Sequence, residues 1–584
     1  HWKISDPVFI LSDVRLSRGA EEVLRLASLR IRFDSYRSLT SGLPIIAEIE
    51  ARGVNFNVLV DGHGARLKGL AHFESDFKSN WLLDTIPHLD RVVLNDVDIA
   101  VQGFKHQTYI RSREGEPWQI IENSEIKSVS LPVYTVVEGQ TEVRENRLNL
   151  TGQYSGDIRA DDFYLKLYLD ISTINIGEYL TDFRIGNHMI TTSNLSSEIW
   201  IEANPSQVII TGDARLSSVL SQRGTLLDQG NLQFRYEGPN FSVGSLSIPM
   251  VELIQDDMHY RLTDISGALE VGSGSLAIAA EVPVVDLKKL GELLQFAGKK
   301  QLLPEKFSAA LNDLNPRGEL QNVNFLIDGS KGQPLMVCRL VDLSIDSYSG
   351  IPAIEPLNGV LMAQPSRGYL DIDSGSFSVN FSNMFAETWS FDSGKGRLAF
   401  ELSEGEVRLE SGLIELVQGE LEAYGKAVVN LPLDRELHSW GLTLGINDAA
   451  LLNSQKFLPK TMSKDMVNWL KASVRAGVSR KTGLTFHGSL FRGSSKVRKA
   501  HDLFFKVSDS NLKYHVDWPP ITQVQGTVHI NNHFVRSSNL IGKVFETSFE
   551  KADLYIPLDV NGRADTVFIE ASSFGPFSDL IRTL

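Results

Sequence analysis

Cysteine is almost absent from this sequence, since Cys338 is the only one among 584 residues. A single thiol excludes an internal disulfide framework and a zinc site built from cysteines. Long hydrophobic runs are also missing, and no segment approaches the ~18–20 apolar residues that a membrane-spanning helix needs. Positive charge is in deficit, because 57 Lys and Arg stand against 72 Asp and Glu and give a formal net charge of −15. Phosphate binding relies on surplus Lys and Arg, so this balance argues against a nucleic-acid-binding protein.

Residue patterns that carry catalytic or metal chemistry are missing as well. The 13 histidines are scattered and form no His-Glu-x-x-His motif. Residues 488–495 come near a phosphate-binding loop, but Ser494 stands where the lysine of such a loop is required. We therefore expect no catalytic residues, no metal and no cofactor, and we do not expect an enzyme.

What the sequence does contain, from end to end, is an alternation of apolar and polar residues. Successive side chains of a strand point to opposite faces, so each alternating segment predicts a β-strand with one apolar face. The apolar positions of the clearest segments are Leu165, Leu167, Leu169 and Ile171; Leu276, Ile278, Ala280 and Val282; Leu421, Ala423, Ala427, Val429 and Leu431; and Leu442, Leu444 and Ile446. Strands with one polar face favour an antiparallel sheet over a buried parallel one. Polar turns such as 228–231 between the strands indicate hairpins.

Helical periodicity is scarce. It predicts short amphipathic helices over 285–298 and 304–314, and a third helix from Ser463 to Ala476. Ser463 is a suitable N-cap of that third helix, and Gly477 stands where a C-terminal cap belongs. The prediction is thus a mainly β chain with a long antiparallel sheet and a few short helices.

One stretch reverses the acidic character of the chain. Between Met466 and His501 there is no Asp or Glu. The basic residues selected there as possible headgroup or membrane contacts are Lys471, Arg475, Arg492, Lys496, Arg498 and Lys499. Such a cluster suits anionic lipid headgroups or an acidic partner. A solvated helix face followed by a solvated loop accounts for the same residues, and the sequence leaves both interpretations open.

Two regions resemble the AsmA-like proteins of Gram-negative envelopes, in particular the YhdP branch, which are relatives of TamB. The first region starts at Trp2 and continues through Pro7 to the Asp13-Val14-Arg15-Leu16 segment. The second covers roughly 390–584 and contains Leu458-Pro459, Trp469-Leu470 and Trp518-Pro519-Pro520 in the order typical of that branch. Phe457 stands where the branch usually has tyrosine, and the loop at 492–502 is more basic than expected.

The resemblance implies a protein of the periplasm that is anchored in the inner membrane and reaches toward the outer membrane. It implies a twisted, curved antiparallel sheet that forms an elongated hydrophobic groove, lined by the apolar positions named above, and phospholipid as the cargo. We expect the sequence to be part of a longer chain whose membrane anchor precedes His1. Four groove segments are expected, over 1–180, 181–300 with a short helix at its end, 301–460, and 461–584 with a helix at its start.

Two other functions stay open at this level. The apolar faces could pack on one another, and the chain would then be a non-transporting all-β scaffold or binding module of the envelope. An enzyme acting on glycan or lipid is the third alternative. Alternation does not separate a groove from a packed scaffold, because an apolar face meets either lipid or a second sheet.

Overall fold

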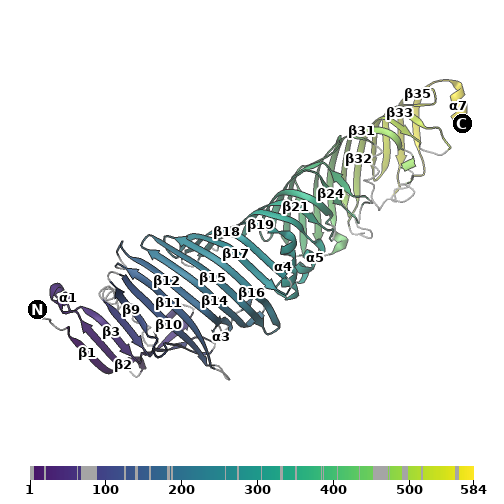
Figure 1. The fold of residues 1–584 in the computed structure, drawn as a ribbon. Coiled ribbons are helices and arrows are strands. Elements are labelled where there is room, and N and C mark those ends of the chain that lie inside the picture. The colour runs from purple at the N-terminus through teal and green to yellow at the C-terminus, as the bar shows by residue number, and fades with distance from the viewer. Residues whose placement is uncertain are drawn as a thin grey trace. The chain divides into compact units, whose positions relative to one another are not determined.

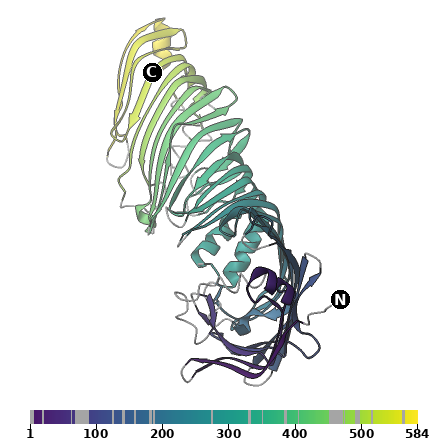
Figure 2. The same cartoon turned by 90° about the vertical axis from the view of Figure 1, so that its left-hand side faces the viewer.

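The computed structural model describes residues 6–583 with gaps. The gaps are 19–20, 62–63, 68–88, 105, 124–125, 139–142, 157–159, 180–183, 186–187, 257, 273–274, 304, 329–332, 349–350, 383–384, 386, 404, 433, 451–467, 469–470, 473, 490–496, 514–516 and 560–563. The chain divides into two compact units (Figures 1 and 2). The first consists of His1–Pro283 and Phe296–Glu305, and the second of Val284–Gln295 and Lys306–Leu584.

The first unit is built almost entirely of strands. In chain order its elements are β1 (Val8–Arg18), β2 (Glu21–Phe33), α1 (Ser35–Ser41), β3 (Ile46–Arg52), β4 (Asn55–Asp61), β5 (Gly64–Leu67), β6 (Arg91–Asn95), β7 (Asp98–Gln102), β8 (Gln107–Arg111), β9 (Trp118–Asn123), β10 (Ile126–Glu138), β11 (Val143–Ser155), β12 (Tyr164–Asn175), α3 (Ile176–Tyr179), β13 (Arg184–Ile185), β14 (His188–Asn204), β15 (Gln207–Ser221), β16 (Gly224–Gly238), β17 (Val243–Gln255), β18 (Met258–Gly272) and β19 (Ser275–Asp286). Helix α4 (Leu287–Lys299) follows, and its residues are divided between the units.

The second unit repeats this construction. Its elements are α5 (Glu305–Leu314), β20 (Arg317–Asp328), β21 (Leu335–Ile345), β22 (Ala353–Ala363), β23 (Arg367–Ser374), β24 (Phe377–Asn380), β25 (Trp389–Phe391), β26 (Ser393–Ser403), β27 (Glu406–Ser411), β28 (Ile414–Gln418), β29 (Leu421–Pro432), the 3₁₀ turn η2 (Arg435–Leu437), β30 (Ser439–Ala450), β31 (Val474–Gly488), β32 (Ala500–Leu512), β33 (Ile521–Asn531), β34 (Phe534–Val544), β35 (Thr547–Pro557), β36 (Phe568–Phe574) and α7 (Phe577–Thr583).

Consecutive strands pair antiparallel in most of the chain, which confirms the predicted fold class. The pairs β15–β16 and β29–β30 are examples, and their partners follow one another without a long connection. Two pairs near the N-terminus depart from the prediction, because β3 runs parallel to β6 and β4 runs parallel to β7.

The parallel pairs arise because the strands near the N-terminus form two layers. Strand β2 pairs with β3 along part of its length and with β4 along another part, and β10 likewise pairs with β9 and with β8. One layer therefore contains β3, β6 and β9, and the other contains β4, β7 and β8. The core between them consists of Leu26, Ala51, Val54, Val97, Ile99 and Val101, all buried. In this part of the chain the apolar face meets protein, as the scaffold alternative expects.

Bulges bend the strands of the second unit. The register shifts near Asn322, Asp342, Asp509 and Asn539, and each of these residues has a positive φ of 50–54°. Asn and Asp enter this left-handed region more readily than other residues that have a Cβ. A bulge adds local twist and bend to a strand. These four bulges therefore contribute to the bending of the strands of the second unit, which are drawn in green and yellow in Figure 2.

The helices are short, as predicted. α4 and α5 lie close to the predicted ranges 285–298 and 304–314. The third predicted helix falls mostly outside the described residues, and its C-terminal end was wrong. Val474 already belongs to strand β31, where it pairs with Leu512 of β32. From Val474 onward the backbone therefore pairs with a neighbouring strand and does not continue the predicted helix. Gly477 is consequently inside a strand. In the described part of the chain, none of the helices combines the length and the apolar character that crossing a bilayer takes.

Candidate functional site

The apolar positions predicted in β12 share one face of the sheet in the first unit. Leu167 lies opposite Gly152 of β11 on one side and opposite Ile201 of β14 on the other. Directly paired residues in an antiparallel sheet point to the same side. The neighbours of Leu167 at alternate positions, Leu165 and Leu169, therefore lie on this side as well, and so does Ile171 up to the register shift that follows it.

The register carries this face across the following strands. From β14 to β19 the successive partners in the row of Leu167 are Ile201, Ile210, Tyr236, Leu246, Gly267 and Ala280. Ala280 is one of the residues predicted at 276–282, and Leu276, Ile278 and Val282 alternate with it along β19. The structure thus brings two predicted segments, far apart in sequence, onto one apolar face. We call this surface the unit 1 face.

Most side chains of the unit 1 face are half-buried. Leu165, Leu167, Leu169 and Ile171 all fall between the buried and the exposed class. The range is wide in β19, where Val282 is 7% exposed and Leu276 is 44% exposed. A packed core would bury the whole row, whereas a flat outer surface would expose it. The observed exposure lies between these two extremes.

Glycines on this face allow close approach between neighbouring strands. A Cβ built on Gly152 would lie 2.6 Å from the Leu167 side chain, and one built on Gly212 would lie 2.4 Å from the Phe234 ring. Both contacts are closer than real Cβ atoms tolerate. The large side chains of the adjacent strands therefore lie over these glycines, which makes the apolar surface flatter.

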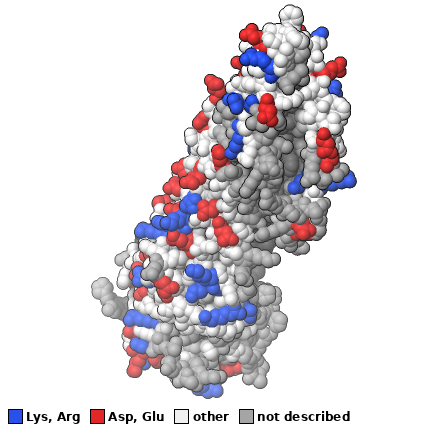
Figure 3. Space-filling model, turned by 90° about the vertical axis from the view of Figure 1, so that its right-hand side faces the viewer, with Lys and Arg blue, Asp and Glu red and all other residues white. Residues whose placement is uncertain are grey.

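The opposite face of the same strands is polar. Lys166, next to Leu167, is exposed and lies 3.3 Å from Glu202 of β14. Trp200 is 43% exposed on this side and its ring packs on Tyr168 at 5.2 Å. In the second unit Arg397 donates to Asp371 at 2.6 Å in the same manner. Figure 3 shows Lys and Arg interspersed with Asp and Glu on the side of the molecule that it displays.

The second unit has an equivalent surface, here called the unit 2 face. Ala423 lies opposite Ile446, Ala427 lies opposite Leu442, and Leu444 lies opposite Gly425. From β28 to β35 the row of Leu444 contains Ile414, Gly425, Leu444, Leu484, Leu503, Ile530, Val535 and Ile556. Leu421 and Leu431 are half-buried and continue the alternation along β29. Ala423 and Val429 are each 6% exposed, so part of this face is buried.

The basic residues are not brought together by the described structure. Arg475 lies at the start of β31, and Lys471, just before that strand, is exposed too. Arg498 and Lys499 follow the opposite end of β31 and are also exposed. Since this strand extends over fifteen residues, the two exposed pairs lie near opposite ends of β31. Arg492 and Lys496 lie outside the described residues.

A buried lysine on the unit 1 face was missed by sequence reasoning. Lys127 of β10 lies directly opposite Tyr154 of β11, and its side chain is only 8% exposed. Its Nζ donates to the Leu89 carbonyl at 2.8 Å and lies 3.5 Å from Glu122. Burial lowers the pKa of Lys127 below its usual value, and burial also raises the pKa of Tyr154. The sequence could have indicated this position, because Lys127 and Val129 are alternate residues of β10 and therefore share a face.

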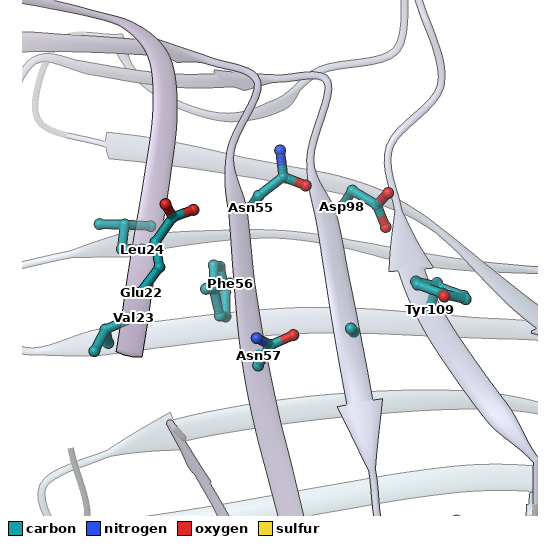
Figure 4. A pocket seen from close by; sticks show the side chains of 9 residues that line it. Glu22, Val23, Leu24, Asn55, Phe56, Asn57, Asp98 and Tyr109 are labelled. Carbon is teal, nitrogen blue, oxygen red and sulfur yellow. The ribbon is translucent and has the colours of Figure 1, made fainter. Parts of the chain in front are cut away.

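A shallow hollow lies on the outer side of the N-terminal layer that contains β4, β7 and β8 (Figure 4). Glu22, Asn55, Asn57, Asp98 and Tyr109 contribute its polar lining. Asp98 accepts a hydrogen bond from Arg111 at 3.1 Å, so one of the two carboxylates is already paired. This polar lining is unlike that of the apolar faces, and it does not suit an acyl chain.

No group of three or more His, Cys, Asp and Glu side chains is arranged to hold a metal ion within the described ranges. The only cysteine, Cys338, is buried, and burial raises the pKa of its thiol to about 11. A thiol in that state is not a nucleophile at neutral pH.

A long, mostly antiparallel sheet with one apolar and one charged face defines the class of the chain as a β-sheet protein. The family comparison adds the particular family, since the YhdP model, described as YhdP protein, matches residues 1–583. The chain therefore belongs to the YhdP family, an AsmA-like family of the Gram-negative envelope that is not known for enzymatic activity. Neither the curated proteins nor the solved structures contain a match.

Proposed function

We propose that this protein carries phospholipid between the inner and the outer membrane, with acyl chains on the apolar faces and headgroups in water. The observation that carries the proposal is the row of apolar residues from β11 to β19, most of them half-buried and all aligned by strand register. Membership of an envelope family supports the same conclusion.

The energetics favour a carrier of this form. Moving one methylene group out of water is worth ~0.8 kcal/mol, so a sixteen-carbon chain needs roughly 12 kcal/mol to cross an aqueous space alone. Many similar positions side by side cover the chain continuously and give no single deep minimum. A lipid is then able to move along the face in small steps. An inner-membrane anchor and a periplasmic location belong to this proposal.

Photo-crosslinking tests the proposal with matched positions. A benzophenone side chain at Leu167 or Leu444 should form adducts with phospholipid, detected by mass spectrometry after purification from an envelope fraction. The same group at Lys166 or Lys426, each exposed on the opposite face, should form few. Equal labelling on both faces, or labelling on neither, would contradict lipid carriage.

A non-transporting scaffold is the second candidate function. The buried core between the two N-terminal layers favours it, because apolar faces there pack on protein. In that case crosslinks from Leu167 and Leu444 should lead to protein partners and not to lipid.

A further inference from the structure

A hairpin of the second unit, paired with β22 at its edge, contributes aromatic side chains to the unit 2 face. Strands β24 and β25 form this hairpin, and Phe377 packs on Phe391 with ring centroids 5.3 Å apart. Both rings are buried among residues of the face that include Leu370 and Leu416. A Cβ on Gly394 would lie 2.6 Å from the Phe377 ring, so the absence of a side chain at Gly394 leaves room for this ring on the face.

Four aromatic rings continue from this hairpin and form one group, here called the aromatic cluster: Phe381, Phe385, Trp389 and Trp440. Trp389 lies 4.4 Å from Phe385 and 5.3 Å from Phe381, measured between ring centroids. Phe381 in turn lies 6.3 Å from Trp440, edge to face. Trp440 comes from β30, where it lies opposite Val429 and therefore on the unit 2 face.

The members of the cluster come from opposite ends of neighbouring strands. β25 lies beside the end of β28, since Asp392 N donates to the Val417 carbonyl at 2.8 Å. Val417 is paired with Glu422, and Trp440 is paired with Val429, seven residues further along β29. Seven residues correspond to about 23 Å along a strand. The rings therefore come from positions far apart along the strands, and Val429 next to Trp440 is buried.

The indole nitrogen of Trp440 lies in this apolar surrounding. The Trp440 Nε1 is buried and has no hydrogen-bond partner in the described structure. A buried indole N–H normally has an acceptor, because leaving it unmade costs the full desolvation of the group. In a phospholipid the ester carbonyl oxygens stand where each acyl chain begins. They are acceptors that reach an apolar surface together with the methylene groups that follow them.

We propose that the aromatic cluster is a specific lipid-binding position, where the rings pack on the first part of an acyl chain and Trp440 Nε1–H donates to an ester carbonyl oxygen. This inference rests on the proposed function and makes it more specific. A uniform groove has no preferred position, whereas this cluster gives the path one place that recognises the ester group.

A double comparison of protein and lipid tests the hydrogen bond. Binding of dipalmitoyl phosphatidylglycerol and of its dihexadecyl ether analogue, which lacks the carbonyls, is measured for the full chain and for Trp440→Phe. The expected result is a preference of about two- to tenfold for the ester lipid, in line with one net hydrogen bond, that Trp440→Phe abolishes. Trp200→Phe, on the polar face opposite the unit 1 face, is the control and should keep the preference.

The outcomes separate the inference from the proposed function. If both lipids bind equally to the unchanged protein, or if Trp440→Phe keeps the ester preference, the hydrogen bond is wrong although lipid carriage stands. If neither lipid binds, lipid carriage itself fails. If Trp440→Phe does not fold, a labelling experiment on the unsubstituted protein still tests the inference. Phosphatidylglycerol with a diazirine beside the ester should label peptides that contain Phe381, Trp389 or Trp440, and labelling elsewhere alone would overturn the inference.

Discussion

A carboxylate placed on the unit 1 face should block lipid carriage and leave the fold intact. Leu167→Asp is the substitution with the best controls, because its side chain is half-buried and aligned with Gly152 and Ile201. Full burial of a leucine is worth about 1.5–3 kcal/mol, so a half-buried one should cost on the order of 1 kcal/mol of stability. On an open face the new carboxylate stays hydrated, and no further penalty of burial is added.

The expected effect of Leu167→Asp on lipid binding is larger than its effect on the stability of the fold. About four methylene groups span the ~4.8 Å between neighbouring strands, and each contributes ~0.8 kcal/mol when it leaves water. A hydrated carboxylate at Leu167 removes roughly 3 kcal/mol from the binding of a chain that passes there. Since about 1.4 kcal/mol corresponds to a factor of ten, occupancy should fall roughly a hundredfold.

Two control variants make the result decisive. Lys166→Asp adds a carboxylate to the neighbouring residue on the outer face and breaks only a surface ion pair, worth ~0–1 kcal/mol, so lipid binding should persist. Val97→Asp puts a carboxylate into the packed core, where the side chain is 2% exposed, and should unfold the N-terminal layers. The assays are thermal melting and the amount of phospholipid recovered per mole of protein. A melting temperature for Leu167→Asp as low as that of Val97→Asp would refute the open face, and unchanged lipid recovery would refute its role.

Four further outcomes follow from individual side chains. Gly267→Val should lower the melting temperature by several degrees, because its Cβ would lie 2.4 Å from the Ala279 carbonyl oxygen, whereas Ser266→Val on the exposed side of the strand should not. Glu122→Gln should destabilise more than Lys127→Met in urea unfolding, since it leaves the buried ammonium with less compensation. Because burial lowers the Lys127 pKa, the unfolded chain holds this proton to higher pH, so stability should rise as pH increases from the folded pKa toward 10.5, a rise that Lys127→Met removes. Cys338 should resist a thiol reagent at pH 8 in the native protein and react fully in denaturant, and rapid reaction of the native protein would contradict its burial.

The sequence was sufficient for the strands and for their apolar faces. The alternation at Leu165–Leu167–Leu169 and at Leu442–Leu444–Ile446 is local, and the structure places each set on one side of a strand. The helical periodicity was misleading at Val474–Ala476, because the predicted helix continued into a segment that pairs with β32. Pairing with a distant strand is a tertiary effect that overrides local propensity.

The register between paired strands could not be predicted from local sequence patterns. A bulge shifts which residues of two strands face each other, and Asn322 and Asp342 do so within strands that otherwise alternate regularly. Both are residues that accept a positive φ, so an Asn or Asp inside an alternating run was the available sign. The contact between Phe381 and Trp440 depends on the tertiary arrangement of the hairpin β24–β25 and β30, and nothing within either segment encodes that arrangement.

The difference between an open and a covered apolar face is likewise set by connectivity. Ile99 and Val101 alternate in β7 as Leu167 and Leu169 do in β12, yet the first pair is buried in a core and the second is half-exposed. The cause is that β2 and β10 each pair with two different strands along their length, which gives the chain a second layer at this point. From β11 to β18, each strand pairs along its main length with the next long strand, so no second layer forms from these pairs. Among the described strands the unit 1 face therefore has no second layer of strands, and it is on this face that the proposed lipid carriage places acyl chains.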